Sequence, residues 1–185
     1  MPLEYRRALA EMKSAHHAGG GVDTDTTEAS MSHNVQGLIA KRACFEAFSQ
    51  LAPADRVAEL EQGFGLLLLK DEAGDPETDP IPPEIAQIAQ ALSVQAPVAF
   101  VETAYFGGAG VQRSALWENG TLVRTCITQP GDPPREDRPI NTVLRALGVD
   151  AGDDGWDEFA MIGLMAYRSN REWLATIAHE TVSDG

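Results

Sequence analysis

Residues 98–127 read VAFVETAYFGGAGVQRSALWENGTLVRTCI, and this stretch decides the expected fold. Residues 98–104 are rich in β-branched and aromatic side chains, which favour an extended strand, and residues 111–118 form the second expected run. The dipeptide Asn119-Gly120 then separates the second run from a third run at 121–127. Asn-Gly between two alternating runs is the strongest short-range signal for a two-residue hairpin turn. The stretch therefore predicts three consecutive strands joined by short turns.

Further elements are expected on both sides of these strands. Alternating apolar residues predict a strand at 34–39, and apolar residues at helical spacing predict a helix at 41–52. A hairpin around Gly63 is expected at 56–70, with a helical conformation of 56–60 as the alternative. Three further helices are expected: one after Pro82-Pro83, one at 140–147 that ends at Gly148, and one after Ser169, which precedes Glu172 by the spacing of a capping box.

The resulting order of elements is β-α-β-β-α-β-β-β-α-α, in which neighbouring strands are mostly joined by short turns. This order favours an α+β domain with a mostly antiparallel or mixed sheet of about five or six strands and helices packed on one face. A chain of 185 residues suits a single domain. We assign that domain to residues 31–185 and interpret residues 1–30 as an appendage, a short helix followed by a mobile linker.

Acidic residues dominate the charge of the chain. The chain has 28 Asp and Glu but only 14 Lys and Arg, which gives a net charge of −14. Such a charge repels nucleic-acid phosphates and attracts cationic partners, so we expect a basic protein partner and no nucleic acid. The acidic run at 150–158 resembles a calcium loop only superficially, because its third position is Gly152 and its twelfth is Met161. No metal or other cofactor is expected.

The expected compartment follows from what the sequence lacks. Residues 1–7 lead into no apolar run of the kind that a secretory signal needs, and no stretch is long enough for a membrane span. The two cysteines, Cys44 and Cys126, form no C-x-x-C pair and suit a reducing environment. We therefore expect a cytoplasmic protein without membrane contact.

The glycine-rich segment 107–110 is the first candidate site. A phosphate-binding loop would need a helix N-terminus after the glycines, but a strand is expected there, so a tight connection or bulge is the simpler interpretation. In the functional interpretation, Gly107 and Gly108 direct Tyr105 and Phe106 toward a groove that binds a partner.

Charged residues provide the second candidate site. Glu102 could pair with Asp157 or Glu158 for acid-base catalysis, which needs two carboxyl groups whose pKa values differ. A chain so rich in acids offers many such pairs, and no catalytic residue is assigned. Arg168 could hold an anion, and an ion pair with Asp157 or Glu158 is the simpler alternative.

Four short motifs carry a resemblance: Tyr-Phe-Gly-Gly at 105–108, a segment at 139–149 that reads PINTVLRALGV, Asp-Glu-Phe at 157–159, and Arg-Ser-Asn at 168–170 followed by Trp173. From Met31 onward the chain resembles a group of uncharacterised bacterial cytoplasmic proteins. Small acidic proteins of this type are often immunity proteins encoded beside a toxin, so the resemblance implies that role by analogy only. It transfers neither an established activity nor a site residue.

Three functions remain open at this point. The leading hypothesis is a non-enzymatic binding protein, an immunity-type inhibitor whose acidic surface binds a basic toxin. The alternative is a small hydrolase or ligand-binding enzyme that uses carboxylates near Glu102 and Tyr105. A third is an oligomeric structural protein, although a monomer or homodimer is the expected state.

Overall fold

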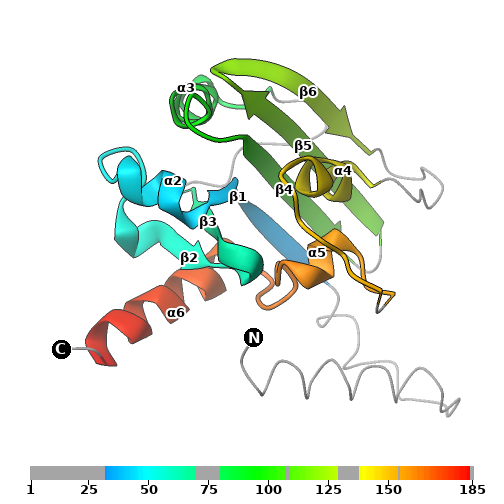
Figure 1. Cartoon of the computed structure of the whole chain (residues 1–185). Helices are drawn as coiled ribbons and strands as arrows, with labels where there is room; N and C mark the ends of the chain where they lie inside the picture. The colour runs from blue at the N-terminus through cyan, green and yellow to red at the C-terminus, as the bar shows by residue number, and fades with distance from the viewer. Residues whose placement is uncertain (1–31, 70–79, 107–108, 129–137, 154, 184–185) are drawn as a thin grey trace, which may run out of the picture.

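The computed structural model describes residues 32–69, 80–106, 109–128, 138–153 and 155–183 (Figure 1). The expected appendage, residues 1–30, lies outside the described residues. The elements are β1 (His33–Lys41), α2 (Arg42–Ala47), η2 (Ala54–Arg56), β2 (Val57–Glu59), η3 (Glu61–Gly63), β3 (Phe64–Leu68), α3 (Pro83–Leu92), β4 (Val98–Phe106), β5 (Ala109–Glu118), β6 (Thr121–Ile127), α4 (Pro139–Ala146), α5 (Glu158–Met161) and α6 (Asn170–Ser183).

Within the described ranges, six strands form one antiparallel sheet in the order β2-β3-β1-β4-β5-β6, which is the centre of the fold. Its last three strands are those that residues 98–127 predict. Asn119 and Gly120 turn between β5 and β6 with φ angles of 51° and 74°, as a type I′ hairpin requires. The α+β class and the antiparallel sheet are thereby confirmed.

Helices cover both faces of the sheet, so the expectation of helices on one face was wrong. Because strand side chains alternate between faces, Ile39 and Leu66 join one cluster while Leu38 and Leu67 join the other. The first cluster includes apolar residues of α4 and α6, and the second includes those of α2 and α3. Continuous apolar runs such as residues 66–69 fit this arrangement, since a strand buried on both faces has no polar side.

Two expected elements are shorter than the sequence predicts. The helix expected at 41–52 ends at Ala47, and the hairpin around Gly63 consists of three residues of β2, the single turn η3 and β3. Gln62 and Gly63 both have positive φ angles, 58° and 72°, which end the strand pairing abruptly. The extended conformation therefore prevails over the helical alternative for residues 57–59.

No helix within the described ranges combines the length and the hydropathy of a membrane-spanning segment.

Candidate functional site

Glu102 is a buried structural residue of the central sheet. Its Oε1 accepts a hydrogen bond from Gln36 Nε2 at 2.7 Å, and its Oε2 accepts one from Arg113 Nε at 2.6 Å. The three residues lie directly opposite one another on β1, β4 and β5, and the Glu102 side chain is 5% exposed. The Arg113 guanidinium also lies 5.5 Å from the centre of the Phe100 ring. Hydrogen bonds and charge pairing thus compensate the burial of this carboxylate.

Tyr105 belongs to the opposite face of the sheet. It is three residues from Glu102 on β4, so the alternation of side chains separates the two. Its pKa is raised, mainly by burial, although the charge of Arg138 and a hydrogen bond with Gln112 act in the other direction. The side chain of Phe106 is not described, and Gly107 and Gly108 lie outside the described residues. The alternative site at Glu102 and Tyr105 therefore does not form as one cluster.

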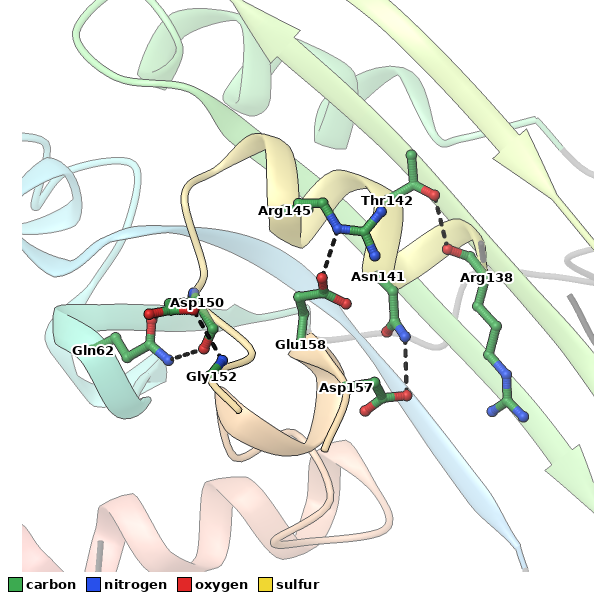
Figure 2. Close-up of polar contacts among 9 residues, drawn as sticks. All are labelled: Gln62, Arg138, Asn141, Thr142, Arg145, Asp150, Gly152, Asp157 and Glu158. Atoms are coloured by element: carbon green, nitrogen blue, oxygen red, sulfur yellow. Dashed lines mark hydrogen bonds and ion pairs between the residues drawn. The ribbon is translucent and has the colours of Figure 1, made fainter. Parts of the chain in front are cut away.

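Asp157 and Glu158 join α5 to α4 (Figure 2). Asn141 Nδ2 donates to Asp157 Oδ2 at 2.9 Å, and Arg145 Nε donates to Glu158 Oε1 at 2.7 Å. The other oxygen of Asp157 accepts from Ala160 N at 3.0 Å and caps the N-terminus of α5. Both carboxylates face α4, on the side of the sheet opposite Glu102, so they do not form the acid-base pair with Glu102 that the sequence left possible.

The segment around Arg168 extends the sheet beside the first residues of β1. Asn34 N donates to Arg168 O at 2.7 Å, and the Asn170 amide accepts from Gln36 N at 2.9 Å and donates to Gln36 O at 2.8 Å. The amide of Asn170 therefore bonds to β1 as a neighbouring peptide group would. Of the two carboxylates expected as ion-pair partners of Arg168, Glu158 pairs with Arg145 and Asp157 accepts a hydrogen bond from Asn141.

Ser169 caps the start of α6 as expected, whereas the Glu172 carboxylate bonds the residue before it rather than Ser169 itself. Glu172 N donates to Ser169 Oγ at 3.3 Å, and Glu172 Oε2 accepts from the backbone N of Arg168 at 2.8 Å. The second contact reaches one residue further upstream than the usual reciprocal bond, which goes to the capping residue itself.

Asp150 and its loop contact the turn η3 (Figure 2). Gln62 Nε2 donates to Asp150 O at 2.8 Å, and Asp150 N donates to Gln62 Oε1 at 3.0 Å. The Asp150 carboxylate accepts from Gly152 N at 2.9 Å, which closes an Asx turn. Across the described part of the chain, no three His, Cys, Asp or Glu side chains are grouped as metal ligands would be.

His33 is a contact residue that the sequence did not reveal. Its ring lies 2.7 Å from Thr103 Oγ1 through Nδ1 and 3.2 Å from Leu164 O through Nε2, and it packs edge-on against Phe159. Burial lowers its pKa. The sequence around His33 predicts the nearby strand but not these contacts, because the partners are 70 and 131 residues distant in sequence.

The outer edge of β6 is the most exposed part of the sheet. Residues 121–125 are exposed on both faces, and Leu122 and Val123 are 48% and 50% exposed. Val94, just after α3, is 66% exposed and lies near Gly120 at the turn into β6. We define the β6 surface as Val94 together with the outer edge of residues 121–127. The alternating pattern of residues 121–127 predicts a strand, but it does not show that this strand lies at the edge of the sheet.

Comparisons with known proteins place the chain in no group. No family model matches its sequence, no curated protein matches it, and no solved structure matches its fold.

Proposed function

We propose that the protein is a non-enzymatic binding protein that recognises a basic protein partner and, like an immunity protein, inhibits that partner by occupying its surface. The β6 surface is the observation that supports this proposal most directly. Three of the four large hydrophobic residues that are exposed in the described part of the chain, Val94, Leu122 and Val123, belong to it. Exposed apolar residues with a polar surround are typical of protein interfaces.

The structural roles of the polar residues also favour binding over catalysis. Glu102, Asp157 and Glu158 each have a defined partner within the fold and lie on two different faces of the sheet. A general acid and base must both reach the same substrate. The hydrolase alternative finds no support in these three carboxylates.

The charge of the chain favours a basic partner, and it is unevenly distributed along the sequence. Residues 71–79 alone contain five carboxylates and no basic side chain. Long-range attraction by these charges would speed the encounter, while apolar contacts would hold the complex.

The experiment compares three full-length chains immobilised on a sensor. The first is unchanged, the second carries D71N, E72Q, D75N, E77Q and D79N, and the third keeps all charges through D71E, E72D, D75E, E77D and D79E. Proteins retained from a lysate of the source organism are identified by mass spectrometry at low and high salt, and the principal one is then purified for kinetics.

We expect a retained protein of high isoelectric point, and an association rate that falls about tenfold in the neutralised chain but not in the charge-conserving control. Retention of acidic or neutral proteins only, or binding that is indifferent to ionic strength, would refute the proposal.

A further inference from the structure

The two edges of the sheet differ in whether a strand of another polypeptide can pair with them. At one edge, β2 has three residues between the turns η2 and η3, and α6 packs against it. At the other edge, β6 has seven residues and pairs only with β5 among the described strands. Short or covered edges resist added strands, whereas long exposed ones accept them. The β6 edge is therefore the one at which an additional strand can pair.

The hydrogen-bond pattern between β5 and β6 shows which backbone groups face outward. Thr128 N donates to Gln112 O at 2.9 Å, so this pair is hydrogen-bonded. Antiparallel pairs alternate, and the registers Ser114↔Cys126 and Ala115↔Thr125 continue the series. The N–H and C=O groups of Thr125 and Ile127 therefore point away from β5. These are the groups that an added strand would bond.

The side chains of β6 specify the chemistry of that added strand. Leu122 lies opposite Trp117, on the same side of the sheet as α3, and supplies an apolar contact. A bulge at Val123 then reverses the alternation, so Arg124, opposite Leu116, faces the other side. Arg124 is exposed and carries the only charge on β6. A complementary segment carries an aliphatic residue beside Leu122 and an acidic residue beside Arg124.

A second copy of the chain fits this edge poorly. Antiparallel pairing of β6 with itself about a two-fold axis at its centre would place Arg124 opposite Arg124, and like charges directly opposite are destabilising. The net charge of −14 adds long-range repulsion between copies.

We propose that the β6 edge binds an extended segment of the partner protein as a seventh strand, with an aliphatic side chain beside Leu122 and a carboxylate beside Arg124. This inference rests on the proposed function, because it names the surface through which the partner is held. Strand addition of this kind takes its affinity from backbone hydrogen bonds and its specificity from the side-chain contacts.

The experiment selects a phage-displayed library of random 12-residue peptides against the full-length chain. Enriched peptides are synthesised, and their affinities are measured for wild type, Thr125→Pro and Thr125→Val. Proline at 125 removes an outward N–H without removing a bond to β5, and edge strands tolerate such a proline. Valine keeps the N–H and serves as the matched control.

We expect enriched peptides with alternating aliphatic residues and at least one carboxylate. Thr125→Pro should weaken their binding about tenfold, Thr125→Val should leave it unchanged, and Arg124→Glu should weaken it about fivefold. Amide hydrogen exchange on the wild type provides a measurement that does not depend on the folding of a variant. The amides of Thr125 and Ile127 should become protected when peptide is bound.

Three results would overturn the inference: no enriched peptide, peptides that bind Thr125→Pro as well as wild type, or unchanged exchange at Thr125 and Ile127. A dimeric mass in light scattering that Thr125→Pro reduces to 19.9 kDa would assign the edge to a second copy instead. Capture of a basic protein that persists in Thr125→Pro would leave the proposed function intact and refute only the role of the edge.

Discussion

His33 has a lowered pKa in the folded protein. Burial is the largest influence on its pKa and lowers it, and the charge of Arg168 acts in the same direction. Glu172 and the backbone carbonyls of Leu164 and Tyr167 raise the pKa but do not offset burial. The folded protein therefore takes up a proton at His33 less readily than the unfolded chain, in which the pKa is about 6.5.

The sign of the pH effect follows by linkage. The stabilisation from neutral His33 is complete above the unfolded pKa and is lost as the pH falls through the lower folded pKa. We expect the free energy of unfolding to decrease below about pH 6.5 in wild type and to depend less on pH in His33→Gln. Urea unfolding between pH 8 and pH 5 measures this, with His179→Gln as the control for an exposed histidine. Parallel curves for wild type and His33→Gln would contradict the assignment.

The side chain of Asn170 joins the start of α6 to two strands of the sheet. Besides its two bonds to the backbone of Gln36, its Nδ2 donates to Leu69 O at 3.3 Å, so the amide joins α6 to both β1 and the end of β3. This geometry explains the position of the Arg-Ser-Asn motif at the start of the helix. Arg168 and Asn170 bond to β1, and Ser169 caps α6.

Replacing Asn170 by Asp should destabilise the protein by about 2–3 kcal/mol, because two carbonyl oxygens lose their donor and face a carboxylate. The exposed neighbour Arg171 is the matched control, and Arg171→Ala should change the free energy of unfolding by less than about 0.5 kcal/mol. Chemical denaturation of the three chains tests the comparison. A loss in Asn170→Asp no larger than that of the control would show that α6 is held by its apolar contacts alone.

The elements themselves were largely predictable from sequence, but their pairing was not. The turn at Asn119-Gly120 and the cap at Ser169 depend on residues that are near in sequence, and both formed as expected. The hydrogen bonds from Asn141 to Asp157 and from Arg145 to Glu158 depend on how α4 and α5 pack against each other. Periodicity predicts which residues face inward, not which partners they meet.

At the scale of the whole molecule, the burial of the sheet on both faces explains why its strands could be predicted from sequence and why the faces covered by helices could not. Residues 35–40 of β1 are buried, and they alternate between two apolar clusters, with Val35 and Ile39 in one and Leu38 and Ala40 in the other. Such a strand is recognisable from its apolar residues, but the side on which a helix will pack is not. Glu102 was a candidate site residue because the sequence does not give the strand register. That register places Gln36 and Arg113 beside its carboxylate.

The described apolar clusters also predict which part of the chain is needed for folding. Their members all lie between Val35 and Ile177. A chain that begins at Met31 should therefore unfold with the same free energy as the full protein, within about 0.5 kcal/mol, and with the same dependence on urea. A chain that begins at Val35 is the control, because it lacks the His33 contacts and the bond from Asn34 to Arg168.

The two shortened chains should differ from each other by at least about 2 kcal/mol, since the longer one retains these three hydrogen bonds and the backbone pairing of His33 and Asn34 with β4. Tryptophan fluorescence can follow both transitions, because Trp117 and Trp173 are buried in the two clusters on opposite faces of the sheet. Coincident transitions from both faces would also indicate that the sheet and its two helical layers unfold as one unit. If the chain beginning at Met31 lost more than about 1 kcal/mol, residues before Met31 would have to contribute to the core, and the assignment of a domain from 31 to 185 would be wrong.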